Sequence, residues 1–328
     1  MAKAVREHLI KALADGSFVS GQEMGEQLGI SRTAISAHIK ALINMGLDIF
    51  SVTGKGYKLS QPLLLLNKKK ILALISTEAT TEIIPEVEVH SLIDSTNDYL
   101  MRRLPNQLTQ GQVCLAEYQS AGRGRRGRQW ISPFGSQIYL SMYWYLEEGL
   151  SGAMGLSLLS ALAVSDAVQA VSGVQVQLKW PNDIYIDGVK LAGILIDLEG
   201  QALEPSHSVI GIGLNLDMPE EAAAKIDQRW TDLQSHSETV LDRNALSAKL
   251  ISCLHSRLVQ YRKEGLTSML DEWNEHDLYL NKQVKLLTGE RITKGICKGI
   301  NNQGALLLEV DGQIKAIYGG EVSLRGDE

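Results

Sequence analysis

The sequence predicts an α+β protein of several domains: an N-terminal winged helix-turn-helix, a central mixed α/β sheet and a small C-terminal β barrel of the SH3-like kind. Three observations support this organisation. Helical periodicity and tight turns fill the first 60 residues, strand and helix patterns alternate from about Val87, and short apolar runs separated by Asn- and Gly-rich turns follow Asn281. We therefore expect domains at residues 1–62, 63–276 and 277–328.

The composition is that of an ordinary globular protein. With 328 residues, of which 44% are hydrophobic, the chain is long enough for two or three domains and a sizeable core. Its net charge of -6 excludes a basic nucleic-acid coat, so any DNA contact must be local. The sequence shows neither a charged-then-apolar leader nor an apolar run of membrane length, which predicts a cytoplasmic protein without a membrane partner.

The cysteine and histidine patterns predict no metal-binding motif. Cys114, Cys253 and Cys297 are odd in number and far apart, which favours buried free thiols over a disulfide framework. The seven histidines form no H-x-x-x-H pair. We therefore expect no protein ligand set dedicated to a transition metal.

Three short helices are expected to begin the chain. Apolar residues at positions 5, 9, 10 and 13 share one helical face, and Asp15-Gly16 ends that helix. The second helix is capped by Ser20 and the third by Ser31, after a tight turn. The inner face of the third helix is expected to hold Ile35, Ile39, Leu42 and Ile43. Helix, turn and helix in this order form the helix-turn-helix pattern.

A β-hairpin is expected next, with its turn at Thr53 to Gly56, and would be the wing of a winged helix. Residues 1–60 hold seven Lys and Arg against five Asp and Glu, a local charge of 7 - 5 = +2 in a chain of net charge -6. We expect the third helix and the wing to contact DNA phosphates and base edges through Ser31, Arg32, Thr33, Ser36, His38, Lys40 and Lys55. The alternative is a three-helix module that binds protein.

The first functional pattern of the central domain is a cluster of small polar residues. A strand is expected at 90–93, after which Asp94-Ser95-Thr96-Asn97 caps a helix that continues to Leu104. Capping accounts for one or two of these four residues. The others present hydroxyls, an amide and backbone N–H groups to whatever lies above the strand end.

Four arginines alternate with three glycines from Gly122 to Arg128, between strands expected at 113–118 and 138–144. Guanidinium stays charged and glycine loses the most backbone freedom on folding, so we expect a mobile loop and not core. Glycine lets backbone N–H groups approach a phosphate, and arginine offers planar donors to phosphate or carboxylate oxygens. The segment is interpreted as an anion clamp that becomes ordered on its ligand. A solvated basic loop or an RNA-binding arginine-glycine tract is the alternative.

Lys190 is the only cation at the start of an apolar strand that continues to Leu198. A long apolar helix, a strand and a hairpin turn at Asp187-Gly188 precede it. From the residues alone, a solvated strand edge is the ordinary role of such a lysine.

The following strand, 208–214, contains Gly211-Ile212-Gly213 without the rest of a dinucleotide fingerprint, so a Rossmann fold is rejected. Residues 217–230 are polar with isolated apolar anchors, which predicts a lid. A helix from Asn244 to about Glu264 and four short C-terminal strands complete the expected fold.

Five motifs in this order resemble the motif set of biotin protein ligases. They are Asp94-Ser95-Thr96-Asn97, Glu117-Tyr118-Gln119, Gly122-Arg123-Gly124-Arg125-Arg126-Gly127, Lys179-Trp180-Pro181-Asn182-Asp183 and Lys190-Leu191-Ala192-Gly193-Ile194-Leu195. With the winged helix, essentially all 328 residues resemble the bifunctional bacterial ligases that also repress biotin operons. Each motif alone is weak, but the ordered set is highly specific.

The resemblance implies a two-step reaction. The biotin carboxylate attacks the α-phosphate of Mg-ATP to give biotinyl-5'-AMP and pyrophosphate, and a lysine of the biotin carboxyl carrier protein then attacks the mixed anhydride. It also implies that biotinyl-5'-AMP is the corepressor, which promotes a homodimer and so aligns two winged helices on operator DNA.

The resemblance also implies roles for individual residues. The catalytic cations would be Lys190, Arg123, Arg125, Arg126 and Arg128, which bring two anions together in a site closed to water. The biotin pocket would be lined by Ser95, Thr96, Asn97 and Gln119. ATP and Mg²⁺ would use Asn182 and Asn215, and the adenine and the adenylate would be covered by Trp130, Ile226 and Trp230. The ligand-binding set is completed by Gly122, Gly124 and Gly193.

Two other functions remain open from the sequence. A lipoate-type ligase shares the catalytic fold and the acyl-adenylate chemistry, but such enzymes typically carry a different arginine-glycine motif and no winged helix. A ligand-sensing DNA-binding regulator without ligase activity is the second. The presence of Lys190 and of every loop arginine argues against it.

Overall fold

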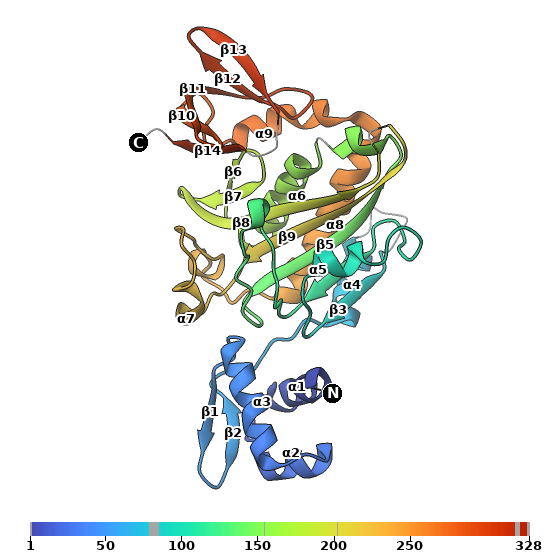
Figure 1. Cartoon of the computed structure of the whole chain (residues 1–328), viewed down its shortest axis with the longest axis vertical. Helices are drawn as coiled ribbons and strands as arrows, with labels where there is room; N and C mark the ends of the chain where they lie inside the picture. The colour runs from blue at the N-terminus through green and yellow to red at the C-terminus, as the bar shows by residue number, and fades with distance from the viewer. Residues whose placement is uncertain (1, 79–84, 154, 202, 319–321, 327–328) are drawn as a thin grey trace.

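Three units follow one another along the long axis of the molecule, with the N-terminal unit at one end and a C-terminal β unit at the other (Figure 1). The computed structural model describes residues 2–78, 85–153, 155–201, 203–318 and 322–326. Among the described helices, none combines the length and the apolar character that crossing a membrane requires. The cysteines form no disulfide in the described part of the chain; Cys114 and Cys297 are buried and Cys253 is half-buried.

The N-terminal unit is a winged helix. Its elements are α1 (Ala2–Leu13), α2 (Gly21–Leu28), α3 (Arg32–Asn44), β1 (Ile49–Val52) and β2 (Gly56–Leu59). The expected caps are present: Ser20 Oγ accepts from the backbone N–H of Glu23, and Ser31 Oγ accepts from that of Ala34. Of the four residues predicted for the inner face of α3, Ile43 is wrong, because it is 41% exposed at the edge of the apolar stripe.

The central unit is built on a seven-stranded mixed sheet in the order β3-β4-β5-β9-β8-β7-β6. Its strands are β3 (Val87–His90), β4 (Val113–Ala116), β5 (Gln137–Leu146), β6 (Gln177–Lys179), β7 (Asp183–Ile186), β8 (Val189–Glu199) and β9 (Ser206–Asn215). Among the described strands of this sheet, only β3 and β4 pair in parallel; the other neighbours are antiparallel. The long β5, β8 and β9 form the middle of the sheet.

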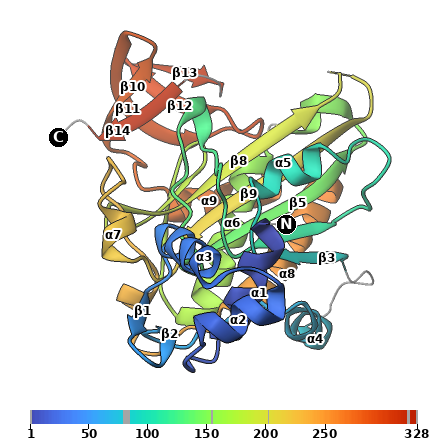
Figure 2. The same ribbon diagram turned by 60° about the horizontal axis from the view of Figure 1, so that its bottom comes forward.

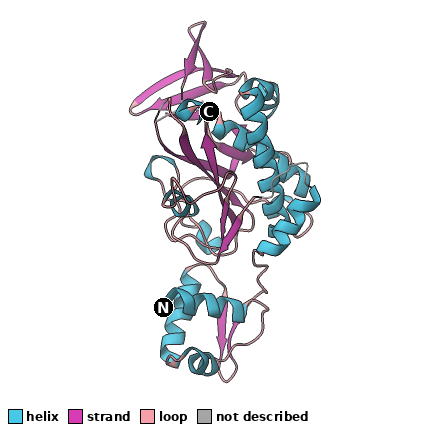
Figure 3. Cartoon of the chain, turned by 90° about the vertical axis from the view of Figure 1, so that its right-hand side faces the viewer, coloured by secondary structure: helices cyan, strands magenta, loops and turns pink. Residues whose placement is uncertain are grey.

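The long helices cover one face of this sheet, and short helices and connecting segments lie over the other (Figure 3). The covered face packs against α4 (Lys68–Glu78), α6 (Leu156–Ser172) and α8 (Arg243–Glu264). The smaller elements are α5 (Thr96–Met101), α7 (Glu220–Ala223), α9 (Leu270–His276) and the 3-10 helices η1 (Arg125–Gly127), η2 (Gly149–Ala153), η3 (Gln234–His236) and η4 (Leu266–Met269). The other face is covered in part by α5, which packs on β4, β5 and β9 through Leu100, and the rest of that face borders the cavity described below.

Two predicted boundaries in the central unit are wrong. The strand expected at 90–93 is β3 at Val87–His90, because pairing with β4 begins at Val87, and only Ile93 makes an isolated bridge, to Gln119. The helix expected to reach Leu104 ends at Met101 and continues as turns. In both cases the tertiary pairing, which the local pattern does not contain, sets the boundary.

The C-terminal unit is a five-stranded antiparallel sheet in the order β13-β12-β11-β10-β14. Its strands are β10 (Gln283–Thr288), β11 (Arg291–Ile300), β12 (Leu306–Val310), β13 (Gln313–Ile317) and β14 (Val322–Gly326). Four strands were predicted, one fewer than are present. The unit is fastened to the central sheet where the backbone N–H of Leu278 donates to the carbonyl of Leu178 at 2.8 Å and the Trp180 indole donates to the carbonyl of Gly304 at 3.0 Å.

The winged helix lies at one end of the central sheet (Figures 1 and 2). Leu92 and Phe134 of the central unit belong to the same buried cluster as the winged-helix core. The backbone N–H of Phe134 also donates to the carbonyl of Met45 at 2.8 Å. The two units are thus in direct apolar and polar contact.

A buried ion pair holds the segment that joins these two units. Arg243 Nη1 lies 2.6 Å from Glu117 Oε2, and the side chains are only 7% and 2% exposed. Glu117 Oε1 accepts from the backbone N–H of Leu66, while Arg243 donates to the carbonyls of Leu64 and Gln137. The pair therefore also forms hydrogen bonds to the linker and to β5, while Nε of Arg243 is buried without a partner among the described residues.

We expect Arg243→Met to destabilise the central unit by about 3 to 5 kcal/mol, because it leaves the Glu117 carboxylate buried without its cation. Urea unfolding followed by tryptophan fluorescence measures this, since all five tryptophans lie between Trp130 and Trp273. Arg262→Met is the control: its ion pair with Glu147 is about 60% exposed on both sides and should be worth at most about 1 kcal/mol. Equal losses in the two variants would contradict the assignment.

Candidate functional site

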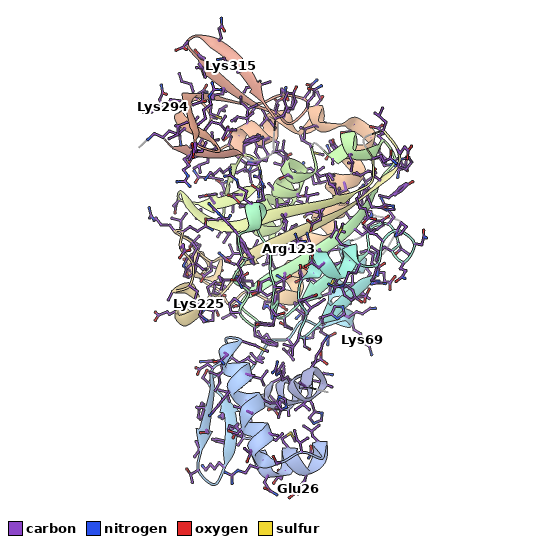
Figure 4. All side chains as sticks on the ribbon, in the orientation of Figure 1. Glu26, Lys69, Arg123, Lys225, Lys294 and Lys315 are labelled. Carbon is purple, nitrogen blue, oxygen red and sulfur yellow. The ribbon has the colours of Figure 1, made fainter. Side chains whose placement is uncertain are left out.

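A cavity of about 140 Å³ lies on the open face of the sheet, over β8 and β9 and beside the glycine-arginine segment. Figure 4 shows Arg123 over the middle of this face. Its lining includes most of the predicted site: Ser95, Thr96, Asn97, Gln119, Arg123, Gly124, Arg125, Arg126, Arg128, Trp130, Asn182, Lys190 and Gly193. Segments far apart in the sequence thus meet in one hollow.

Glycines make the floor of this cavity. A Cβ at Gly213 would lie 2.5 Å from the indole of Trp130, and a Cβ at Gly211 would lie 2.2 Å from Oδ1 of Asn97. Both distances are shorter than a real Cβ contact, so neither position accepts a side chain without displacing its neighbour. Gly193, on the next strand, also faces Trp130, at 3.2 Å. The missing side chains let Trp130 and Asn97 lie directly on β8 and β9, where both residues line the cavity.

Small polar groups form one wall. Ser95 caps α5 by accepting from the backbone N–H of Asp98. Gln119 Oε1 accepts from the backbone N–H of Thr96 at 2.9 Å, and its Nε2 donates to Ser132 Oγ at 3.2 Å. The wall therefore has fixed donors and acceptors, as expected from the strand-to-helix cluster.

The glycine-arginine segment forms a short 3-10 turn, η1, and its first arginine is held by two carboxylates. Arg123 Nη2 lies 2.6 Å from Asp98 and 2.7 Å from Asp197. Burial lowers the pKa of Arg123, but the hydrogen bonds from Asp197 and Asp98 outweigh it, so that the pKa is raised. Arg125 donates to Asn182 Oδ1 at 2.9 Å, and burial lowers its pKa. The expected loop is thus anchored at two arginines.

Lys190 points into the cavity and is not a solvated strand edge. Its Nζ lies 2.7 Å from Asp183 Oδ1, and its side chain is 14% exposed. The same Nζ lies 5.6 Å from the centre of the Trp130 ring, whose Nε1 donates to Gln137 at 2.7 Å. A cation held between one carboxylate and one aromatic ring is placed to receive an anionic ligand.

A second cavity of about 760 Å³ adjoins the first, and the two share Arg128, Gln129, Trp130, Lys190 and Gln228. The predicted lid residues Ile226 and Trp230 and the predicted ligand residue Asn215 line this larger cavity and not the smaller one. Its wall is completed by Lys225, Arg229 and, from the C-terminal unit, Tyr279 and Arg325. The combined site therefore has a small pocket with a wall of small polar groups and a larger pocket, and arginine and lysine side chains line both.

Sequence reasoning missed several lining residues. They are Gln129, Asp183, Ile194, Leu195, Gly211, Ile212, Gly213 and Gln228. The glycine pair was considered only as a failed dinucleotide fingerprint, although glycines two apart on a strand share one face and so indicate a flat floor. Gly122 was predicted as a ligand residue but lies behind the wall, where a Cβ would be 2.6 Å from Ser132 Oγ and the Trp130 carbonyl.

No group of three or more His, Cys, Asp or Glu side chains that could hold a metal ion occurs in the described part of the chain. Asn182 and Asp183 supply two side-chain oxygens between the arginines and Lys190. A Mg²⁺ ion that is coordinated mainly by substrate phosphates needs only one or two ligands from the protein. The two oxygens of Asn182 and Asp183 are sufficient for such an ion.

The predicted DNA-contacting residues divide between two faces of α3. Arg32, Ser36 and Lys40 recur every fourth residue on one side of the helix, and Arg32 and Lys40 are exposed. His38 is half-buried on another side, where burial and the nearby Arg6 lower its pKa. Lys55 of the wing is exposed, with its Nζ 5.6 Å from the ring centre of Phe18. The remaining two, Ser31 and Thr33, are exposed at the start of α3.

Three family models match the chain in the order of its three units. Residues 5–58 match an HTH domain, residues 89–215 match the biotin/lipoate A/B protein ligase family, and residues 279–325 match the biotin protein ligase C-terminal domain.

Relatives of the whole chain carry the same combination. The bifunctional ligase/repressor BirA of Escherichia coli is 46% identical over 98% of this chain and 97% of its own length. The protein of that name from Bacillus subtilis is 30% identical over 99% of this chain and all of its own length. Among solved structures, the biotin protein ligase from Aquifex aeolicus in complex with biotin and ATP superposes with a TM-score of 0.62, at 29% identity, over 74% of this chain and 99% of that one.

Proposed function

The chain belongs to the family of bifunctional ligase/repressors, and on that premise we propose that it is an ATP-dependent biotin–protein ligase that also represses transcription of biotin genes. The observation that carries the ligase assignment is the meeting of Lys190 and the loop arginines over a glycine floor, beside a wall of small polar groups.

The site chemistry suits the joining of two anions. A carboxylate and a phosphate repel one another in water, and fixed cations in a desolvated site offset that repulsion in the transition state. We assign the biotin ring to the polar wall and its carboxylate to Lys190, with the nucleotide in the larger basic cavity. The α-phosphate then lies between Lys190 and the segment Arg123–Arg128, and Ile226 and Trp230 cover the adenylate.

Mg²⁺ would be held by Asn182 and Asp183 together with the phosphates of ATP, and would supply charge neutralisation to the departing pyrophosphate. The protein residues orient the reactants. In the second step, a lysine amine of a biotin carboxyl carrier protein attacks the acyl carbon of the adenylate, and AMP leaves. We propose the domain limits 1–62, 63–276 and 277–328 for the parts that bind DNA, carry the site and complete the nucleotide cavity.

Mass spectrometry of the product formed from purified protein, biotin, ATP and Mg²⁺ tests this function, with lipoate in a parallel reaction. Biotinyl-5'-AMP from the first reaction alone is expected. An adenylate from lipoate would identify a lipoate-type ligase, and no adenylate in either reaction would identify a regulator that only senses its ligand.

Lys190→Met should lower the rate of biotinyl-5'-AMP formation by about 10² to 10³-fold, the effect of removing one preorganised charged group. Lys294→Met is the matched control, because Lys294 is exposed on β11, in the C-terminal unit and away from Arg123 (Figure 4). The control should keep the wild-type rate. An unchanged rate in Lys190→Met would remove Lys190 from the mechanism.

A free strand edge supports a homodimer as the form that binds DNA. Strand β7 pairs only with residues 189–193 of β8, so in the described part of the chain residues 196–199 have a strand neighbour on one side only. Leu198 on this edge is 42% exposed. An exposed apolar edge is a ready site for pairing with the same edge of a second copy. Asp197 of this edge holds Arg123, so the ligand loop and the edge are in contact.

The repressor function places α3 and the wing on operator DNA, with two copies on a palindromic site. Both operator DNA and ATP are found in the bacterial cytoplasm, where we place the protein.

Arg32→Gln and Lys40→Gln should each reduce the slope of log affinity against log salt concentration by about one unit, because each removes one phosphate contact. Operator binding measured over a salt series gives this slope. Lys69→Gln, on α4 of the central unit, is the exposed control and should keep the wild-type slope. A wild-type slope in the first two variants would place those side chains away from the DNA backbone.

A further inference from the structure

A chain of hydrogen bonds lies beneath the polar wall of the small cavity, and one of its members, Ser141, belongs to no predicted site. Ser141 is on β5, fully buried, and paired with Gly211 of β9. Its Oγ lies 2.5 Å from Oδ1 of Asn97 and 2.7 Å from Oγ1 of Thr96. Since Gly211 has no side chain, Asn97 can reach down to this serine.

The orientation of the Asn97 amide is fixed at its far end. Its Nδ2 donates both hydrogens to acceptors that cannot donate in return, the carbonyl of Leu195 at 3.2 Å and Oδ2 of Asp197 at 2.8 Å. The reverse orientation would set oxygen against oxygen at both places. Oδ1 of Asn97 must therefore face Ser141, and this atom can only accept.

Ser141 has one hydroxyl hydrogen and two close neighbours. The hydrogen must go to Asn97, because Oδ1 has no hydrogen to give. Ser141 is then left with lone pairs toward Thr96, so the Thr96 hydroxyl must donate to Ser141 across the 2.7 Å contact. Oγ1 of Thr96 also lies 3.1 Å from Gln119 Oε1. Because this contact is longer than the one to Ser141, the Thr96 hydrogen is directed to Ser141.

The upper end of the wall is fixed in the same way. Gln119 Oε1 faces the backbone N–H of Thr96, which orients the amide. Ser132 donates to the Trp130 carbonyl at 2.9 Å, so it accepts from one hydrogen of Gln119 Nε2. The second Nε2 hydrogen meets no acceptor among the described residues. Gln119 thus offers a donor to a ligand.

We propose that Ser141 is a positioning residue that sets the hydrogen-bond polarity of the biotin pocket, and so its preference for a ureido ring. By taking the Thr96 hydrogen, it leaves Thr96 Oγ1 able only to accept from a ligand, next to the Gln119 donor. A cyclic urea presents N–H groups beside a carbonyl, which is the complement of this acceptor and donor pair. The inference rests on the proposed biotin-binding function of the same site.

The test compares biotin with two analogues in which one or the other ring N–H of the ureido group is replaced by oxygen. Adenylate formation, followed by pyrophosphate release, gives kcat and KM for each. In the wild type, the analogue whose oxygen faces the Thr96 lone pairs should be rejected. In Ser141→Ala, the Thr96 hydroxyl loses its acceptor at 2.7 Å and keeps only the longer contact to Gln119 Oε1 at 3.1 Å, so it can turn and donate to that oxygen. We expect the KM for biotin to rise about tenfold, kcat to stay within about twofold, and the preference for biotin over that analogue to fall about tenfold.

Ser208→Ala is the matched control. Ser208 is equally buried on β9, and its hydroxyl donates to the Trp144 carbonyl, outside the chain of hydrogen bonds from Asn97 through Ser141 to Thr96. Thr96→Val removes the hydroxyl that Ser141 is proposed to direct. In the Thr96→Val background, Ser141→Ala should change the preference no further, whereas two independent effects would add.

The possible results distinguish a failure of the proposed ligase function from a failure of the role assigned to Ser141. If the wild type and Ser208→Ala form no adenylate from biotin, the proposed function fails. If they do, but Ser141→Ala weakens biotin and analogue equally, Ser141 has only a structural role and the inference is overturned. An additive effect in the double variant would overturn it as well.

Discussion

The site depends on a sheet that carries no side chains at the centre of one face. Gly193, Gly211 and Gly213 lie on adjacent strands, and each missing Cβ is replaced by an atom of another segment, either Trp130 or Asn97. The opposite face is covered by α4, α6 and α8, whose packing supplies the stability of this unit. A layered fold would ordinarily fill both faces with apolar groups. Here the glycines instead let the Trp130 indole and the Asn97 amide lie against the backbone of the strands, and these two groups border the cavity.

Two cations of the site are paired with carboxylates before any ligand arrives. Arg123 is held by Asp98 and Asp197, and Lys190 is held by Asp183. An anionic ligand therefore competes with carboxylates that already satisfy the cations, and part of its attraction is spent in replacing them. The same contacts keep the cations near their working positions, which limits the reorganisation that catalysis requires. A site with unpaired arginines would attract anions more strongly but would hold them less precisely in place.

Local rules were sufficient where one residue acts on its own backbone. The caps at Ser20 and Ser31 followed from hydroxyls placed before apolar helical patterns, and both are present. The role of Lys190 could not follow from its neighbours, since what distinguishes it from a solvated edge is Trp130, 60 positions earlier in the sequence. Ser141 was beyond sequence reasoning for a similar reason. A serine within an apolar strand is ordinary until the register sets it opposite Gly211 and beneath Asn97.

The two proposed functions meet in two short stretches of chain. Glu117 anchors the linker to the winged helix through the backbone N–H of Leu66, and Gln119, two residues on, forms the wall of the pocket. Trp130 covers the glycine floor, and Phe134, four residues on, is buried in the winged-helix core. Because Glu117 is tied to Arg243 in a buried pair, the first stretch cannot shift without breaking costly contacts. A ligand that moves Gln119 or Trp130 therefore acts on segments that also seat the winged helix, so the pocket and the DNA-binding unit are mechanically joined within one chain.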